Sequence, residues 1–128
     1  MIKRPATAAD LPQLIALEAA CNPHPWSGRQ LEASLVQDSV EVVDNDGKIV
    51  AMLVSKSLFG EAEIYLVDTL AAFRRQGWAK QLIQGLQAAN ERIFLEVRAS
   101  NIAAQHVYAA LGFRQIALRR EWCVVGEQ

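Results

Sequence analysis

Hydrophobic residues near the start of the chain have the spacing of a helix. The apolar side chains that share one helical face are Leu11, Leu14, Ile15 and Leu17. Thr7 and Asp10 precede them in the arrangement of a capping box, in which a hydroxyl and a carboxylate three residues later satisfy free amides. We therefore predict a helix over residues 8–20.

The segment Pro23-His24-Pro25 ends this helix, because proline lacks an amide donor and favours an extended residue before it. Ser27 with Gln30 three residues later forms a second capping box. Trp26, directly before that cap, is placed to pack against the next helix or to shape a binding groove. The pattern predicts a second helix over residues 28–37.

From residue 40 the pattern changes to short apolar runs of strand length. Residues 40–43 and 48–56 flank the segment Asp44-Asn45-Asp46-Gly47, whose composition is typical of a hairpin turn. A further turn at Phe59-Gly60-Glu61 leads into the apolar-rich residues 62–69. We predict three strands that pair antiparallel in chain order.

The second half alternates between helical and strand-like segments. Residues 77–89 have apolar positions at helical spacing, and residues 92–99 form an apolar run. Together with the strand before them they predict a strand–helix–strand crossover.

The last segments complete an α+β pattern. A helix over residues 102–111, capped by Ser100 or Asn101, ends at Gly112 and precedes a strand over residues 113–122. The elements predict a mixed, mostly antiparallel sheet flanked by about four helices, in a single domain that spans the whole chain.

Composition limits the classes of function. With 128 residues, 52% of them hydrophobic, the chain can bury roughly two thirds of its unfolded surface, enough for a core without disulfides or structural metal. The 13 basic and 14 acidic residues give a net charge of −1, whereas nucleic-acid-binding domains carry a basic excess. The longest apolar run, residues 49–54, is far below the roughly 18 residues of a membrane-spanning helix, and the first residues lack a secretory signal.

The cysteines and histidines show no metal-ligand spacing. Cys21 and Cys123 lie far apart, and only His24 and His106 could join them. We interpret both cysteines as reduced thiols. We therefore expect a cytoplasmic protein that is a monomer or weak dimer, with no metal and no nucleic-acid or membrane partner.

Positive charge gathers where a predicted strand leads into the helix over residues 77–89. The segment is Phe73-Arg74-Arg75-Gln76-Gly77-Trp78-Ala79-Lys80. A helix N-terminus presents unpaired amides and the positive end of the dipole, and Gly77 lets a ligand approach the backbone closely. This favours a phosphate or pyrophosphate site, although a basic helix entry without a ligand has the same pattern. The glycine spacings of the Walker and Rossmann motifs are absent from the segment.

The same segment resembles a known family. Arg74-x-x-Gly77-x-Ala79 is similar to the acyl-CoA pyrophosphate signature of the GNAT N-acetyltransferases, Gln/Arg-x-x-Gly-x-Gly/Ala, at the same strand-to-helix position. The resemblance covers residues 2–122. Within the family, three runs resemble the RimI branch, whose members acetylate the N-terminal alanine of a small-subunit ribosomal protein: residues 24–27 (His-Pro-Trp-Ser), 95–101 (Leu-Glu-Val-Arg-Ala-Ser-Asn) and 107–113 (Val-Tyr-Ala-Ala-Leu-Gly-Phe).

The resemblance implies a set of residues that bind acetyl-CoA. Backbone groups at the end of the third strand would hold the pantetheine arm as an added strand, and the basic loop would hold the pyrophosphate. Asn101 matches a further cofactor contact, beside its interpretation as a helix cap. The implied cofactor-binding residues are Val67, Asp68, Thr69, Arg74, Arg75, Gln76, Gly77, Trp78, Ala79, Lys80 and Asn101.

The resemblance also implies two catalytic residues. Glu96 lies in an apolar-rich strand, where an unpaired carboxylate is costly and its pKa tends to rise. It would be the general base that deprotonates the attacking ammonium through water, or else a partner in an ion pair with Arg98 or another basic side chain. Tyr108 would be the general acid that protonates the departing CoA thiolate, or else a core aromatic residue with a satisfied hydroxyl.

These roles imply an N-acetyltransferase that moves an acetyl group from acetyl-CoA to a primary amine in a ternary complex. The RimI-like runs point to the N-terminal alanine of a ribosomal protein as the acceptor. Two alternatives stay open: a non-catalytic acyl-CoA-binding regulator of a partner protein, and an acetyltransferase for a lysine or small-molecule amine.

The C-terminus carries one more expectation. RimI-like chains continue past the segment Arg119-Arg120-Glu121-Trp122 into a further strand, and residues 123–128 look too few for a loop and a strand. We therefore expect the final strand to be missing, with an open acceptor side and an exposed strand edge.

Overall fold

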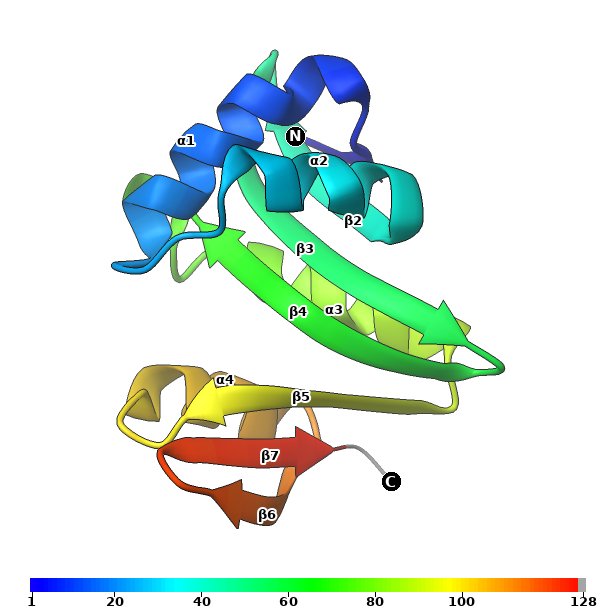
Figure 1. Ribbon diagram of the computed structural model, residues 1–128, viewed down its shortest axis with the longest axis vertical. Coiled ribbons are helices and arrows are strands. Elements are labelled where there is room, and N and C mark those ends of the chain that lie inside the picture. Colours follow the sequence, from blue (N-terminus) through cyan, green and yellow to red (C-terminus); the bar gives the residue numbers. More distant parts are fainter. Residues whose placement is uncertain (127–128) are drawn as a thin grey trace.

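The computed structural model describes residues 1–126 and is built on one seven-stranded sheet (Figure 1). The strands lie in the order β1-β2-β3-β4-β5-β7-β6, and every neighbouring pair is antiparallel except β4 with β5. The strands are β1 (Ile2–Pro5), β2 (Ser39–Asn45), β3 (Lys48–Leu58), β4 (Glu61–Thr69), β5 (Arg92–Arg98), β6 (Arg114–Arg119) and β7 (Trp122–Gly126).

Helices cover both faces of the sheet. They are α1 (Leu11–Cys21), α2 (Gly28–Gln37), α3 (Trp78–Ala89) and α4 (Ile102–Ala110), with short 3-10 turns at Ala8–Asp10 and Ala71–Phe73. In Figure 1, α1 and α2 lie over β2–β4 on one side, whereas α3 and α4 lie behind the sheet. None of these helices is both long and apolar enough to cross a membrane.

Both predicted capping boxes are present, the first at the 3-10 turn Ala8–Asp10 that leads into α1 and the second at α2. The Thr7 amide donates to Asp10 Oδ2 at 2.7 Å. The Ser27 amide donates to Gln30 Oε1 at 2.8 Å, and the Gln30 amide donates to Ser27 Oγ at 3.2 Å. Because these bonds depend only on residues three apart, the predicted bounds of α2 match the structure.

The two faces of the sheet carry separate hydrophobic clusters. One packs α1 and α2 against β2 and β3 around Leu14, Leu31 and Met52. The other packs α3 and α4 against β4 and β5 around Ile83 and Leu95. The site described below lies where the elements of both clusters meet.

Strands β4 and β5 separate soon after they pair. Their parallel ladder contains only the partners Glu61–Arg92, Ala62–Ile93 and Glu63–Phe94. Beyond these residues the two strands diverge (Figure 1). The remainder of β4 therefore has β3 as a neighbour on one side and an open edge on the other.

The structure corrects the expectation that the final strand is missing. Arg120, with φ of 55°, and Glu121 form a tight turn, so the predicted strand over residues 113–122 is divided into β6 and the first residue of β7. Strand β7 lies between β5 and β6 and leaves β6, whose residues are all exposed, at the edge. The prediction failed because the turn takes only two residues; Glu127 and Gln128 lie outside the described residues.

The sequence patterns also missed β1. This strand has four mostly exposed residues and exists because Lys3 and Arg4 pair with Val43 and Val42 of β2. Its formation depends on a partner some 40 positions away rather than on its own periodicity.

An ion-pair network holds β1 to its neighbours. Arg4 Nη1 lies 2.8 Å from Asp10 Oδ2, and Arg4 Nε lies 3.0 Å from Asp44 Oδ2. The hydrogen bond from Arg4 lowers the pKa of Asp10 from 3.8 to about 2. A carboxyl whose pKa is lowered on folding stabilises the fold above its unfolded value, and this stabilisation is lost as the pH falls through the folded value.

The substitution Asp10→Asn should therefore lower the free energy of unfolding at pH 7 by about 2 kcal/mol. The difference from the wild type should shrink as the pH falls from 4 to 2. Urea unfolding followed by tryptophan fluorescence measures both effects. Asp46→Asn, in the exposed β2–β3 turn, is the matched control, and an equal deficit at pH 2 and pH 7 would rule out the ion pair as the cause.

Candidate functional site

A cavity of about 620 Å³ lies where β4 diverges from β5. Residues from α1, the end of β4, the loop before α3, α3 itself and α4 contribute to its walls. They are Cys21, Val67, Asp68, Thr69, Phe73, Arg74, Arg75, Ala79, Ile83, Asn101, Ala103, Ala104, Val107 and Tyr108. Most of the residues predicted for the site are therefore in this one cavity.

Five predicted residues are not part of its lining: Gln76, Gly77, Trp78, Lys80 and Glu96. The first four belong to the loop before α3 and to the first turn of that helix. There the indole Nε1 of Trp78 donates to Gln76 Oε1 at 3.3 Å.

The open edge of β4 presents backbone groups toward the cavity. Leu70 donates its amide to Val50 O of β3 at 2.9 Å. Since backbone groups of successive residues in a strand point to opposite sides, Val67 and Thr69 direct theirs to the open edge, whereas the backbone of Asp68 faces β3. An extended ligand arm could therefore pair with Val67 and Thr69.

Two side chains fix the end of this edge. The carbonyl of Thr69 accepts hydrogen bonds from Arg74 Nε at 3.0 Å and from Cys21 Sγ at 3.3 Å. Burial raises the pKa of the Cys21 thiol, which keeps the thiol a donor. The carbonyl of Thr69 is thus occupied, and its amide is the group left to a ligand.

The start of α3 has the properties of an anion site. Gly77 is the N-cap with φ of 85°, it supplies no capping side chain, and the first turn contains no acidic residue. The first helical amides consequently have neither intrahelical nor side-chain partners. Arg74 and Arg75 of the preceding loop and Lys80 of the first turn add positive charge to this segment, which suits a phosphate group.

Asn101 combines the two roles considered for it. Its Oδ1 accepts the amide of Ala104 at 3.1 Å and so caps α4, and the residue also lines the cavity. The helix cap is confirmed, whereas the cofactor contact stays a prediction.

Tyr108 lines the cavity and is buried, with 8% of its surface exposed. Its ring packs on Phe113 with centroids 5.6 Å apart. Burial, with a smaller effect from Asp68, raises the pKa of Tyr108 to about 12. Its hydroxyl therefore keeps its proton at neutral pH.

The expected burial of Glu96 is wrong. Along β5 the side chains alternate, and Leu95 and Val97 face the core whereas the Glu96 side chain is 42% exposed. Its Oε1 lies 3.1 Å from Arg119 Nη1, so the ion-pair interpretation has its partner. The Glu96 side chain is exposed because α1 and α2 do not extend over its face of β5 (Figure 1). The sequence of the strand does not show which face a helix covers.

Arg98, the basic residue first considered as the partner of Glu96, makes other contacts. Its Nη1 lies 3.5 Å from Glu121 Oε2, and its guanidinium lies 4.6 Å from the centre of the Trp122 ring.

Glu18, which was not predicted from the sequence as a site residue, has a fully buried side chain beside Asp68 of the cavity. Its Oε2 accepts the amide of Trp26 at 2.8 Å. Burial and a hydrogen bond with Glu18 raise the pKa of the neighbouring Asp68 to about 9. One signal was present in the sequence, because Glu18 falls on the apolar helical face of Leu11 and Leu14.

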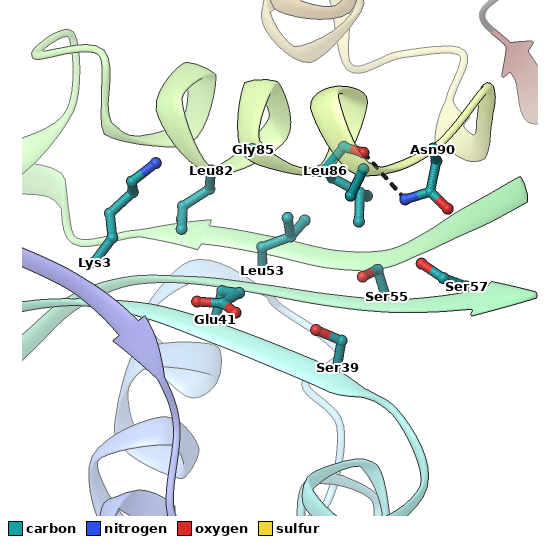
Figure 2. A pocket seen from close by; sticks show the side chains of 11 residues that line it. Lys3, Ser39, Glu41, Leu53, Ser55, Ser57, Leu82, Gly85, Leu86 and Asn90 are labelled. Carbon is teal, nitrogen blue, oxygen red and sulfur yellow. Dashed lines mark hydrogen bonds between the residues drawn. The ribbon is translucent and has the colours of Figure 1, made fainter. Parts of the chain in front are cut away.

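A second hollow, of about 420 Å³, lies between α3 and the strands β1–β3. Figure 2 shows Ser39, Ser55 and Ser57 on the strand side, and Asn90 donating to the carbonyl of Leu86 on the helix side. No residue predicted for the site lines this hollow. The candidate site is therefore the cavity beside β4.

Comparison with known proteins identifies the family that the sequence motifs indicated. The family model described as the acetyltransferase (GNAT) family matches residues 11–113. The [ribosomal protein bS18]-alanine N-acetyltransferase of Haemophilus ducreyi is 32% identical in an alignment of length 120 that covers 88% of this chain and 82% of that protein. The resemblance stated from the sequence is confirmed.

Solved structures share the fold. The ribosomal-protein-S18-alanine N-acetyltransferase of Escherichia coli superposes with a TM-score of 0.91 at 23% identity, covering 98% of this chain and 92% of that one. The paia N-acetyltransferase of Thermoplasma acidophilum, in complex with coenzyme A, gives a TM-score of 0.88 at 13% identity, covering 99% and 98%. The predicted α+β fold with four flanking helices is confirmed.

Substitution of Gly77 tests the helix start as a ligand site. Gly77 and Gly112 both have positive φ, and an added Cβ would meet nothing within 4 Å at either position. Alanine should therefore cost about 1–2 kcal/mol of stability at both. Only Gly77→Ala should weaken coenzyme A binding, by about tenfold, because it displaces the first amides of α3. Calorimetric titration measures this, and equal weakening by Gly112→Ala would contradict the assignment.

Proposed function

The chain belongs to the acetyltransferase (GNAT) family, and on this premise we propose that it acetylates the N-terminal alanine of ribosomal protein bS18, with acetyl-CoA as the donor. The observation that carries the proposal is the cavity beside β4, which joins an open strand edge to a positively charged helix start. The relative from Haemophilus ducreyi, named for this acceptor, supports the choice of substrate.

The donor fits the residues of the cavity. A pantetheine arm would pair with the backbone of Val67 and Thr69 as an added strand, and the pyrophosphate would take the amides around Gly77 with Arg75 and Lys80. Acetyl-CoA supplies an acetyl group activated as a thioester. Binding along β4 would direct that thioester toward the gap between β4 and β5.

The two catalytic candidates lie on opposite faces of the sheet. Glu96 lies on the face of β5 that α1 and α2 leave uncovered, and Arg119 holds its carboxylate. From there it would take a proton from the acceptor ammonium, through water, before the amine attacks. Tyr108 lies on the other face and retains its proton at neutral pH, so it would donate that proton to the departing sulfur.

The acceptor would enter beside the segment of residues 22–26. This segment lies between α1 and α2 and carries Trp26, whose ring lies 6.3 Å from that of Tyr65 on β4. An N-terminal peptide could reach Glu96 across this uncovered part of the sheet. Cytoplasmic localisation and a monomeric or weakly dimeric state remain part of the proposal.

The roles of Glu96 and Tyr108 can be separated from binding. Glu96→Gln and Tyr108→Phe should each lower kcat/KM by about 10²–10⁴-fold, because each removes a proton-transfer group. The dissociation constant of acetyl-CoA should change by less than about twofold, which is under 0.5 kcal/mol. Glu121→Gln, which removes the carboxylate paired with Arg98, is the matched control. Parallel losses of rate and acetyl-CoA affinity would refute the assigned roles.

The acceptor is tested with peptides. A peptide with the N-terminal sequence of bS18 should release CoA thiol in the presence of acetyl-CoA, and mass spectrometry should place the acetyl group on its α-amine. The same peptide with a blocked N-terminus should release none. Acetylation of lysine side chains or of free polyamines instead would favour the alternative acceptors, and binding of acetyl-CoA without any thiol release would favour a regulator.

A further inference from the structure

Two buried carboxyl groups meet between α1 and β4, and neither belongs to the reaction described above. Glu18 has no exposed surface and Asp68 has 6% exposed. Among the residues that the structure describes, Glu18 Oε1 and Asp68 Oδ2 are buried side-chain oxygens without a donor. An ionised carboxylate can only accept hydrogen bonds, so two carboxyl groups bond to each other only when one carries a proton.

The surroundings of Asp68 favour its protonated form. Burial, followed by the hydrogen bond and the charge of Glu18, raises the pKa of Asp68 to about 9. Of the other groups that face it, Arg74 from the loop after β4 opposes this shift, and Cys21 of α1 and Tyr108 of α4 are neutral at pH 7 because their own pKa values are raised.

The pair also connects two parts of the site. On one side, Glu18 Oε2 accepts the backbone amide of Trp26 at 2.8 Å and the side-chain amide of Asn22 at 3.5 Å. On the other side, Asp68 lines the cavity beside β4. With a proton between the two carboxyl groups, hydrogen bonds would connect the segment of residues 22–26 to the strand that would bind the donor.

We propose that Glu18 and Asp68 share one proton, and that this proton positions residues 22–26 as a wall of the acceptor site against the end of β4. The proposal rests on the proposed function, since it assigns that wall to an acceptor. Without the proton, two like charges would face each other in a buried place. The wall would then move away from β4 and acceptor binding would weaken.

Carbon-detected NMR tests the shared proton without any activity. The side-chain carboxyl carbon of Asp68 and the backbone nitrogen of Trp26 should titrate together with a midpoint near pH 9, and the titration of Trp26 should be absent in Asp68→Asn. Titration of Asp68 below pH 6, or a Trp26 nitrogen that does not change between pH 6 and 10, overturns the proposal.

Kinetics test the positioning role. The quantity to follow is the KM of the wild type divided by the KM of Asp68→Asn. Between pH 8 and 10 this ratio should rise severalfold for the acceptor peptide, whereas it should stay constant for acetyl-CoA. Titration of the peptide's own amine is common to both proteins and cancels in this ratio. Asp46→Asn should retain the wild-type profile. A constant ratio of peptide KM values across this range overturns the positioning role.

A second variant covers the case in which Asp68→Asn does not fold. Glu18→Gln still accepts the Trp26 amide and can donate to Asp68, so the midpoint of Asp68 should fall well below pH 9 and the alkaline rise in peptide KM should disappear. An unchanged midpoint overturns the proposal. If no peptide is acetylated at any pH, the proposed function fails, while the NMR titrations decide the shared proton on their own.

Discussion

Strands β4 and β5 pair over only three residues each, and the site depends on their separation afterwards. A strand edge buried without partners would leave backbone groups unsatisfied, so the open edge of β4 must be paired by something or remain accessible. Both strands contribute side chains to the cluster beneath α3 and α4, and β4 also packs against α1 on the other face. Past residue 63 the cavity, rather than β5, therefore lies beside the edge of β4.

The same separation matters for the two catalytic candidates, which lie on opposite faces of the sheet. Side chains alternate along β5, so Leu95 and Val97 pack into the core with Tyr108 while Glu96 points outward. In a continuous sheet, groups on opposite faces could not reach one bond. The gap between β4 and β5 removes this barrier, because a thioester placed in it would be accessible from both sides. One geometric feature would thus provide both the proposed donor site and access for the two proposed catalytic residues from opposite faces.

Features that depend on residues close together in the chain were predicted from the sequence, whereas features that depend on distant residues were not. The bounds of α2 and the cap by Asn101 depend on residues three apart, and both were predicted. Strands β1 and β7 depend on partners distant in the chain, and neither was predicted as a separate strand. The burial of Glu96 was wrong because an apolar run shows that a strand is packed but not which face a helix covers. The cavity walls were mostly predicted because the family signature fixes the strand end and the helix start together.

Acidic residues at the two ends of α1 show that the surroundings of a carboxyl group determine its contribution to the stability of the fold. Asp10 is bonded to Arg4, its pKa is lowered, and its stabilising effect is present at neutral pH. The pKa of Asp68, opposite Glu18 at the far end, is raised, so its contribution to stability is full below pH 4 and declines as the pH rises toward 9. At neutral pH the buried pair of Glu18 and Asp68 stabilises the fold less than an apolar contact of the same shape would. Local arrangements that cost stability are found mainly at functional sites. The place of this pair, between the segment that carries Trp26 and the strand that lines the cavity, agrees with that rule.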